Sequence, residues 1–103
     1  MQGPYNPGRF ANFPLSLDLD WKKGRLARGK VYRVIKFFRD ADGQEHLIGE
    51  KWKFLGSMFN RYDDELELCV QTVDESEWCI PLNWSKDQQA DVIQNWKNYF
   101  AHE

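Results

Sequence analysis

Hydrophobic and polar positions alternate through much of residues 30–82, and this pattern predicts a succession of half-buried strands. Lys30–Phe38 is rich in β-branched and aromatic residues, which favour strands. Asp40–Gly43 supplies turn residues. Glu50–Gly56 places its tryptophan and its first phenylalanine on one face and its lysines on the other. We therefore expect two strands separated by a turn, each with one buried face.

The clearest pattern is a hairpin formed by Glu65–Thr72 and Glu77–Leu82, with Asp74–Ser76 as its polar turn. A slip of one residue would set apolar side chains against polar ones on every rung, so the pattern specifies the register. Pro81 removes one backbone donor, which predicts a sheet edge or a strand end at that position. The predicted cross-strand pairs are Leu66 with Leu82, Leu68 with Ile80, and Val70 with Trp78.

Cys69 and Cys79 fall on one rung of this predicted hairpin, on the face opposite the apolar pairs. We therefore expect them to face each other on the less buried side of the sheet, next to Glu77. Their spacing is not that of a zinc knuckle. We interpret them as small side chains that fill space in the protein and whose thiols stay reduced in the cell. They are close enough to each other to oxidise where the geometry permits.

The periodicity changes after Ser85, where apolar residues recur at helical spacing. Ser85 and Gln88 fit a capping box with Ser85 as the N-cap. A helix of about 16 residues is marginal alone in water, so we expect it to dock on the sheet. Its predicted apolar stripe consists of Val92, Ile93, Trp96, Tyr99 and Phe100.

Residues 1–14 hold three of the four prolines together with several other turn formers. These residues oppose both helix and strand, so we expect an extended arm that docks its aromatic side chains. Leu15–Trp21 alternates and predicts a short strand, with a single helical turn over Asp18–Lys23 as the alternative. The chain thus divides into an arm, 1–14, and one domain, 15–103.

Together these elements predict a mainly β fold with one C-terminal helix, built as a small antiparallel barrel or as a sheet packed by the helix. Within 29–56, Gly29–Val34, a polar Asp42-Gly43 loop and Gly49–Gly56 resemble the beginning of an SH3-like barrel. Residues 29–100 as a whole resemble a family of small bacterial domains of unknown function; the further residues that carry this likeness are Tyr62, Leu66, Glu67, Leu68, Gln89, Ile93, Asn95 and Tyr99. The resemblance implies an SH3-like fold and transfers no functional residue.

Charge is distributed unevenly, although the net charge is only −2. Residues 21–39, the basic segment, contain eight basic and no acidic residues, whereas 40–103 contain five basic and fourteen acidic ones. Such a segment either binds a polyanion or pairs with acidic strands of its own sheet. We expect the second arrangement, in which Arg33 and Lys36 meet acidic side chains across strands, namely Glu65, Glu67 or Glu77.

No catalytic or cofactor-binding motif is recognisable in the sequence. His46 follows a turn and His102 lies near the C-terminus, so no triad or metal quartet is visible. The carboxylates of 63–67 lack the spacing and the glycine of a calcium loop, and we interpret them as a solvated loop. We therefore expect no enzymatic activity, no cofactor and no metal. Without an apolar run long enough to span a membrane and without a signal sequence, we expect a cytoplasmic protein.

Aromatic residues make up 16% of the chain, and we assign most of them to the core. Aromatic side chains in loops can also anchor a partner. We therefore favour a protein-interaction module, of adaptor or immunity type, that binds another protein through Phe59, Tyr62 or Trp84. The alternative is single-stranded nucleic-acid binding by the basic segment, through Lys22, Lys23, Arg25 and Arg28. An enzyme ranks third.

Overall fold

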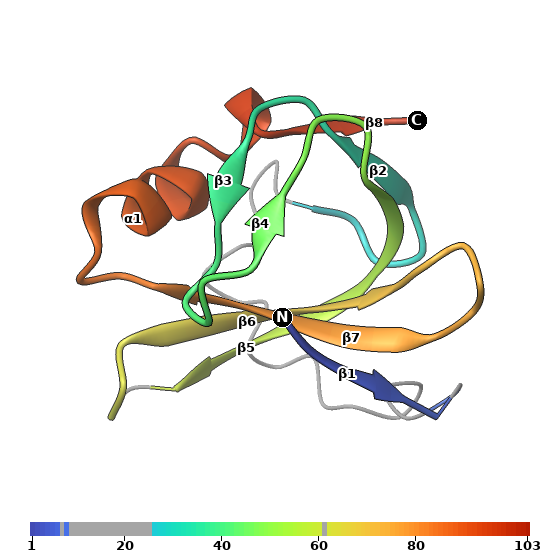
Figure 1. The fold of residues 1–103 in the computed structure, drawn as a ribbon, viewed down its shortest axis with the longest axis horizontal. Helices are drawn as coiled ribbons and strands as arrows, with labels where there is room; N and C mark the ends of the chain where they lie inside the picture. The colour runs from blue at the N-terminus through green and yellow to red at the C-terminus, as the bar shows by residue number, and fades with distance from the viewer. Residues whose placement is uncertain (7, 9–25, 61) are drawn as a thin grey trace.

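A computed structural model describes residues 1–6, 8, 26–60 and 62–103. These residues form an antiparallel, mainly β fold with one α-helix near the C-terminus (Figure 1). This is the fold class that the hydrophobic pattern predicts. The strand or helical turn expected within 15–23 lies outside the described residues.

Six strands form one sheet in the order β1-β7-β6-β5-β2-β8, and β3 pairs separately with β4. The edges β1 and β8 do not pair with each other, so the sheet is open. Helix α1 (Asp87–Gln94) precedes a 3-10 turn (Trp96–Asn98). The strands are β1 (Gln2–Tyr5), β2 (Val31–Val34), β3 (Phe38–Arg39), β4 (Glu45–His46), β5 (Lys51–Asn60), β6 (Glu65–Gln71), β7 (Glu77–Asn83) and β8 (Phe100–His102).

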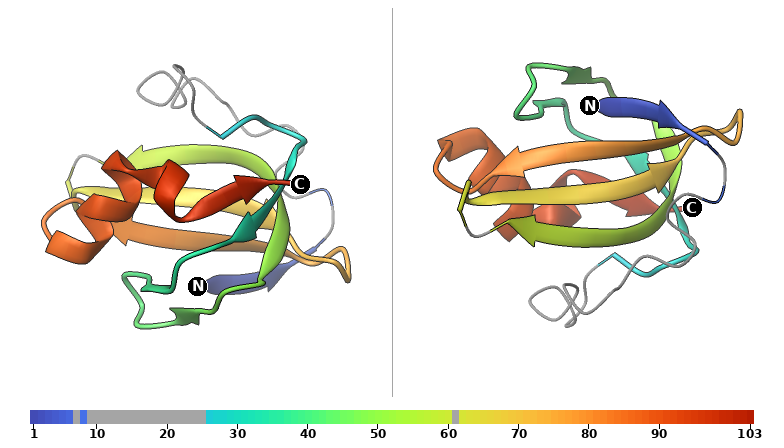
Figure 2. Two further views of the ribbon diagram at one scale, coloured as in Figure 1. Left: turned by 90° about the horizontal axis from the view of Figure 1, so that it is seen from above. Right: turned by 90° about the horizontal axis from the view of Figure 1, so that it is seen from below.

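The sheet curls because β5 bends along its length. The β5–β6 register shifts between Phe54 and Gly56, which marks a bulge. Gly56 has a φ of 152°, a conformation that glycine adopts without the steric cost of a side chain. Before the bend, at Lys51–Lys53, β5 pairs with β2, and β2 and β8 thereby lie over the face formed by β5, β6 and β7 (Figures 1 and 2). The curl lets one open sheet enclose most of a core.

The main core fills the curl, and α1 and the segment that follows it cover the same face of the sheet (Figure 2). Trp52 and Phe54 are buried there, whereas Lys51 and Lys53 are exposed, as the alternation predicts. The other fully buried apolar side chains come from four strands and the helix: Val34, Phe38, Leu68, Val70, Ile80, Leu82, Val92 and Ile93.

The β6–β7 hairpin has the predicted register, including all three predicted apolar pairs. Thr72 N–H donates to the carbonyl of Ser76, and hydrogen-bonded rungs alternate with open ones from there along the ladder. Pro81 therefore lies on an open rung, where its missing N–H would point away from β6. β1 pairs with β7 only between Glu77 and Cys79, so Pro81 lies at a sheet edge, as predicted.

The N-terminal strand β1 was not predicted, because its glycine and proline oppose a ladder. It pairs with the outer edge of β7 through backbone groups. Cys69 and Cys79 do share a rung, but the expectation that they lie on the less buried side is wrong. Both are buried in a small second cluster against Tyr5 and Leu55. Glu77, also expected outside, is buried as well, because it pairs with Tyr5 of β1 and accepts a hydrogen bond from Gly8 N–H.

The helix begins later than the sequence predicts, and the expected capping box is absent. Lys86 occupies the N-cap position of α1 without a side-chain hydrogen bond. The Ser85 hydroxyl donates instead to Asn83 Oδ1 at 2.5 Å. Asn83 thus holds the serine in the turn that leaves β7, and the serine does not cap the helix.

The helix also ends after eight residues, about half the expected length. The Asn95 side chain donates to Asp91 Oδ1 at 2.7 Å, and the Tyr99 hydroxyl donates to Asp91 Oδ2 at 2.5 Å. These two bonds close a turn back onto the helix. Tyr99 and Phe100 are buried as predicted, but Phe100 begins β8 and pairs with Val34.

Candidate functional site

His46 is a buried imidazole held between two carboxylates. Its Nε2 lies 2.8 Å from Asp40 Oδ2, and its Nδ1 lies 2.7 Å from Glu50 Oε2. The ring stacks on Phe38, its partner across the β3–β4 rung, with ring centres 4.5 Å apart. Only the protonated imidazole offers an N–H donor to both carboxylates at once. We call Asp40, His46 and Glu50 the histidine cluster.

The histidine cluster continues on both sides. The N-terminal amine of Met1 lies 2.7 Å from Asp40 Oδ2. The other oxygen of Asp40 accepts hydrogen bonds from two backbone N–H groups of the following turn. On the far side, Trp52 Nε1 donates to Glu50 Oε2 at 3.1 Å. Each buried charge therefore has an opposite charge and further hydrogen bonds, as buried ions require.

These contacts shift two pKa values in opposite directions. Burial acts to lower the pKa of His46, but its hydrogen bonds to Asp40 and Glu50 outweigh burial and raise that pKa above its ordinary value. Burial acts to raise the pKa of Asp40, but the hydrogen bonds from His46 and from the Met1 amine hold it below its ordinary value. Both shifts favour the imidazolium–carboxylate pair over the neutral pair.

The histidine cluster joins structural elements and offers His46 no open side toward a substrate. Its contacts tie β4 to the β3–β4 turn and to the residue preceding β5. Sequence reasoning set His46 aside because it follows a turn. One feature of the sequence could have indicated its burial. His46 lies opposite Phe38 in the hairpin that turns at Asp40–Gly43, and a residue paired with a core phenylalanine is expected to face inward. Within the described residues, no group of three or more potential ligands is arranged to hold a metal ion.

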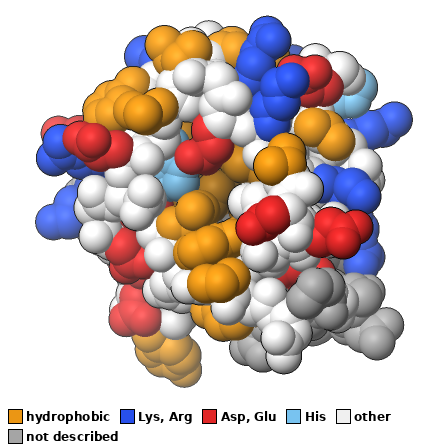
Figure 3. Space-filling model, turned by 45° about the vertical axis from the view of Figure 1, so that its right-hand side comes forward, with side chains coloured by type: hydrophobic (Ala, Val, Ile, Leu, Met, Phe, Trp, Pro, Cys, Tyr) orange, Lys and Arg blue, Asp and Glu red, His pale blue; other side chains and the backbone are white. Residues whose placement is uncertain are grey.

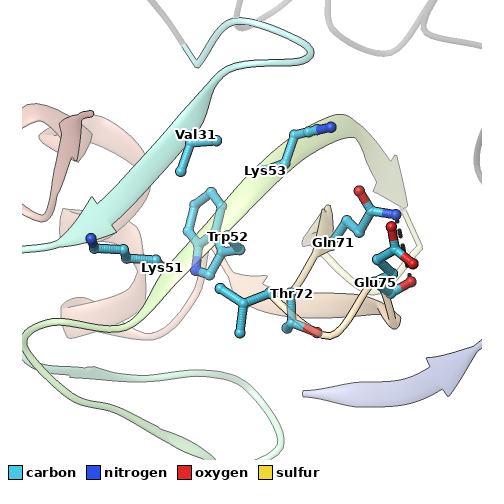
Figure 4. Close-up of a pocket in the computed structure, with 8 residues that line it drawn as sticks. Val31, Lys51, Trp52, Lys53, Gln71, Thr72 and Glu75 are labelled. Atoms are coloured by element: carbon cyan, nitrogen blue, oxygen red, sulfur yellow. Dashed lines mark hydrogen bonds between the residues drawn. The ribbon is translucent and has the colours of Figure 1, made fainter.

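A shallow hollow of about 270 Å³ lies between the β2–β5 pair and the β6–β7 turn (Figure 4). Trp52 lies near its middle, between Lys51 and Lys53, and Glu75 approaches from the turn. The Trp52 side chain is almost entirely buried and belongs to the main core. Charges of both signs line this open depression, so it favours neither an anionic nor a cationic ligand.

Exposed apolar side chains gather on two neighbouring loops, β2–β3 and β4–β5. Val34 N–H donates to the carbonyl of Glu50, so the loops lie side by side (Figure 1). Figure 3 shows hydrophobic side chains in several groups among charged ones on the face seen there. Four exposed apolar residues of the two loops form what we call the loop-tip patch. The exposed fractions of these residues are 38% for Ile35, 38% for Phe37, 60% for Leu47 and 70% for Ile48.

The three aromatic residues predicted to bind a partner lie at one end of the sheet. Phe59 faces Leu66 across the β5–β6 ladder, and Trp84 N–H donates to the Asp64 carbonyl beside the same turn. Tyr62, in that turn, is fully exposed. Phe59 and Trp84 pack partly against the main core. The structure therefore brings the three close together, but only Tyr62 projects freely.

The predicted nucleic-acid residues Lys22, Lys23 and Arg25 lie outside the described residues, whereas Arg28 is exposed in the turn before β2. The expected pairing of Arg33 with the hairpin acids is wrong. Because β2 lies between β5 and β8, Arg33 approaches Glu103 at 3.6 Å, and Lys51 approaches the same carboxylate at 3.6 Å.

Lys36 likewise does not meet the hairpin acids, and its Nζ lies 4.9 Å from the ring centre of Tyr99. The acidic loop of 63–67 is only partly solvated, since Glu65 and Glu67 are half-buried. Burial and the neighbouring Glu67 raise the pKa of Glu65, and burial raises the pKa of Glu67. No helix in the described part of the chain is both long and apolar enough to cross a membrane.

The open curled sheet, the short covering helix and the apolar loops define a small antiparallel α+β domain. The chain belongs to the family described as domain of unknown function (DUF3601), which matches residues 15–102. This confirms the resemblance to an uncharacterised family of small domains. Among curated proteins, none matches the chain.

A solved structure supports the fold. It is an integron cassette protein from the mobile metagenome of Vibrio cholerae, with 29% sequence identity to this chain. The similarity covers 76% of this chain and 88% of the cassette protein, with a TM-score of 0.72. Both the family and this neighbour are consistent with a small bacterial domain.

Proposed function

We propose that this domain is a non-enzymatic protein-binding module that docks on an apolar surface of another protein through the loop-tip patch. The observation that carries the proposal is the gathering of four exposed apolar side chains on two adjacent loops. Exposed apolar side chains that cluster mark interaction sites more often than isolated exposed apolar side chains do. Loops on a rigid scaffold are also the usual place for binding residues.

The histidine cluster supports this proposal because it braces the patch from within. His46 immediately precedes Leu47, and Glu50 follows Ile48 by two residues. The His46–Glu50 contact therefore anchors both ends of the loop that carries the two most exposed patch residues. A loop fixed in this way loses little conformational entropy on binding, which favours affinity.

The same contacts favour a binding role over catalysis. A general base must reach a substrate proton within hydrogen-bonding distance. Both nitrogens of His46 are engaged inside the protein, and its side chain is unexposed. An adaptor or immunity-type role in a bacterial cell fits a small binding module of this kind.

The test is site-specific crosslinking in cells that express the full chain, with a photoreactive amino acid at Leu47. The captured protein is then purified, and its affinity is measured for the unmodified domain, for Leu47→Asp and Ile48→Asp, and for Val73→Asp. Val73 is a matched control because it is 88% exposed in a different turn. We expect each patch variant to weaken binding by about tenfold or more, as a charge at a central contact does.

Two results would contradict the proposal. One is a partner whose affinity is unchanged by both patch variants. The other is a partner that still binds the patch variants but is released by Val73→Asp or by Tyr62→Ala. Release by Val73→Asp would point to the hollow beside the β6–β7 turn. Release by Tyr62→Ala would point to the end of the sheet that carries Tyr62. Circular dichroism of each variant confirms that the fold is retained.

A further inference from the structure

We propose that Cys69 and Cys79 are a reversible disulfide site, and that strand β1 is the cover that controls its oxidation. The two sulfur atoms lie 3.9 Å apart on facing positions of β6 and β7. They belong to a small buried cluster with Tyr5 and Leu55, separate from the main core.

The rung itself suits a disulfide. Thr72 N–H donates to Ser76, so hydrogen-bonded and open rungs alternate from that pair, and Cys69–Cys79 is an open rung. Facing Cα atoms on open rungs approach to about 4.5 Å, within the range of roughly 4.4–6.8 Å that a disulfide spans. Side-chain rotation can then bring the sulfur atoms to bonding distance without moving either strand.

The chemistry needs a small two-electron oxidant, and hydrogen peroxide is the class we propose. One cysteine thiolate attacks a peroxide oxygen, the O–O bond breaks, and the leaving hydroxide takes up a proton to become water. The resulting sulfenic acid is attacked by the other thiol, the S–S bond forms, and the S–OH oxygen leaves as a second water. Two thiols are oxidised to one disulfide, and one peroxide is reduced to two waters.

Access to the sulfur atoms is limited by β1. Both side chains are at most 4% exposed, and buried thiols react slowly. β1 is an edge strand that pairs with β7 at Gln2–Cys79 and Tyr5–Glu77, with an irregular register between those pairs. Opening of this edge strand would expose Cys79 and leave the β6–β7 ladder intact.

Gly3 provides a way to loosen the cover. A Cβ at this position would lie 2.8 Å from the Trp78 ring and 2.9 Å from the carbonyl oxygen of Glu77. Gly3→Ala therefore pushes β1 away from β7. Gly29→Ala is the matched control, because Gly29 also has a positive φ, of 82°, but a Cβ there meets nothing within 4 Å.

The experiment treats the folded full chain with hydrogen peroxide, quenches with catalase, and blocks remaining thiols with N-ethylmaleimide before intact-mass measurement. We expect the loss of two hydrogen atoms, no maleimide addition, a linked peptide pair containing Cys69 and Cys79, and full reversal by dithiothreitol. Cys69→Ser and Cys79→Ser should each stop at a sulfenic acid that dimedone traps. Gly3→Ala should react about tenfold faster or more, and Gly29→Ala at the unmodified rate.

Added oxygen without a disulfide, or disulfides only between chains, would overturn the site. An unchanged rate in folded Gly3→Ala would overturn the role of β1. If Gly3→Ala does not fold, Tyr5→Ala replaces it, since Tyr5 of the same strand packs against the cysteine cluster. Oxidation of Tyr5→Ala at the unmodified rate would then count against the cover.

Discussion

His46 Nε2 lies 2.8 Å from Asp40 Oδ2, and neither side chain reaches solvent. Asp40 directly follows β3, and His46 ends β4, so this contact closes the short β3–β4 pair from the inside. A second contact from the same ring, to Glu50, attaches that pair to β5. A hairpin with two-residue strands would be marginal without such an internal brace.

We predict that the stability of the fold decreases as the pH rises above the ordinary imidazole value. The folded state raises the pKa of His46, so its stabilisation is complete below the unfolded pKa of 6.5 and is lost as the pH rises through the folded value. Urea denaturation from about pH 5 to about pH 9 measures the effect, because Asp40 stays ionised across that interval.

His46→Gln is the control for this pH dependence. Glu65 and Glu67 also have raised pKa values, and their contribution likewise declines as the pH rises. These acids titrate in both proteins, so the difference between the two stability curves isolates His46. A difference that stays constant across this interval would mean that folding does not shift the pKa of His46, and one that grows as the pH rises would mean that His46 is uncharged in the folded protein.

His46→Ala should destabilise the protein by about 3–5 kcal/mol, because it removes the buried cation that lies between Asp40 and Glu50. Glu45→Ala, one residue earlier, removes only an exposed pair with Arg39 and should cost about 0–1 kcal/mol. Chemical denaturation of both variants measures the two losses. Equal, small losses would mean that the histidine cluster contributes little to stability.

We predict no salt-dependent binding to mixed single-stranded DNA or RNA at micromolar protein. Arg39 lies 2.6 Å from Glu45, and Arg33 and Lys51 share Glu103, so two cations of the basic segment, together with Lys51 of β5, already face carboxylates. Such pairs cancel the local field that attracts a polyanion. Fluorescence anisotropy at low and high salt tests the prediction. Saturable binding that Lys22→Glu with Arg25→Glu abolishes would establish the nucleic-acid alternative instead.

The β6–β7 hairpin was predictable because its register follows from local alternation alone. β1 was not, because its pairing with β7 uses backbone groups that leave no side-chain pattern. The histidine cluster was also hidden, since Asp40, His46 and Glu50 meet only when β3 pairs with β4 and the β4–β5 loop folds back onto β4. The loop-tip patch was missed for the same reason, because nothing in the sequence places the β2–β3 loop beside the β4–β5 loop.

The C-terminal segment shows how two periods can fit one sequence. Tyr99 and Phe100 continue the helical stripe of Val92 and Ile93, so the sequence pattern favours one long helix. In the structure, Asn95 and Tyr99 bond back to Asp91, and the chain continues as β8 against β2. The free edge of β2 offers backbone hydrogen bonds that a continued helix would leave unused, and this long-range pairing outweighs local periodicity.

The docking of α1 leads to the last prediction, which compares a fully buried residue of the helical stripe, Ile93, with a half-buried one, Trp96. Ile93→Ala should destabilise the protein by about 2–5 kcal/mol, because the side chain is fully buried under the sheet. Trp96→Ala should cost less than a fully buried tryptophan would, about 1–3 kcal/mol, because Trp96 only packs partly against the core.

Gln94→Ala, at an exposed position of the same helix, is the matched control and should change stability by at most about 0.5 kcal/mol. Thermal and urea denaturation of the three variants rank the sites. A larger loss for Trp96→Ala than for Ile93→Ala would mean that the helix continues through residue 96 in solution and buries the indole, as the sequence periodicity alone predicts. A larger loss for Ile93→Ala is the result that the turn at Asn95 predicts, because the turn leaves Trp96 half-buried and places Phe100 in the core as the partner of Val34 in β2.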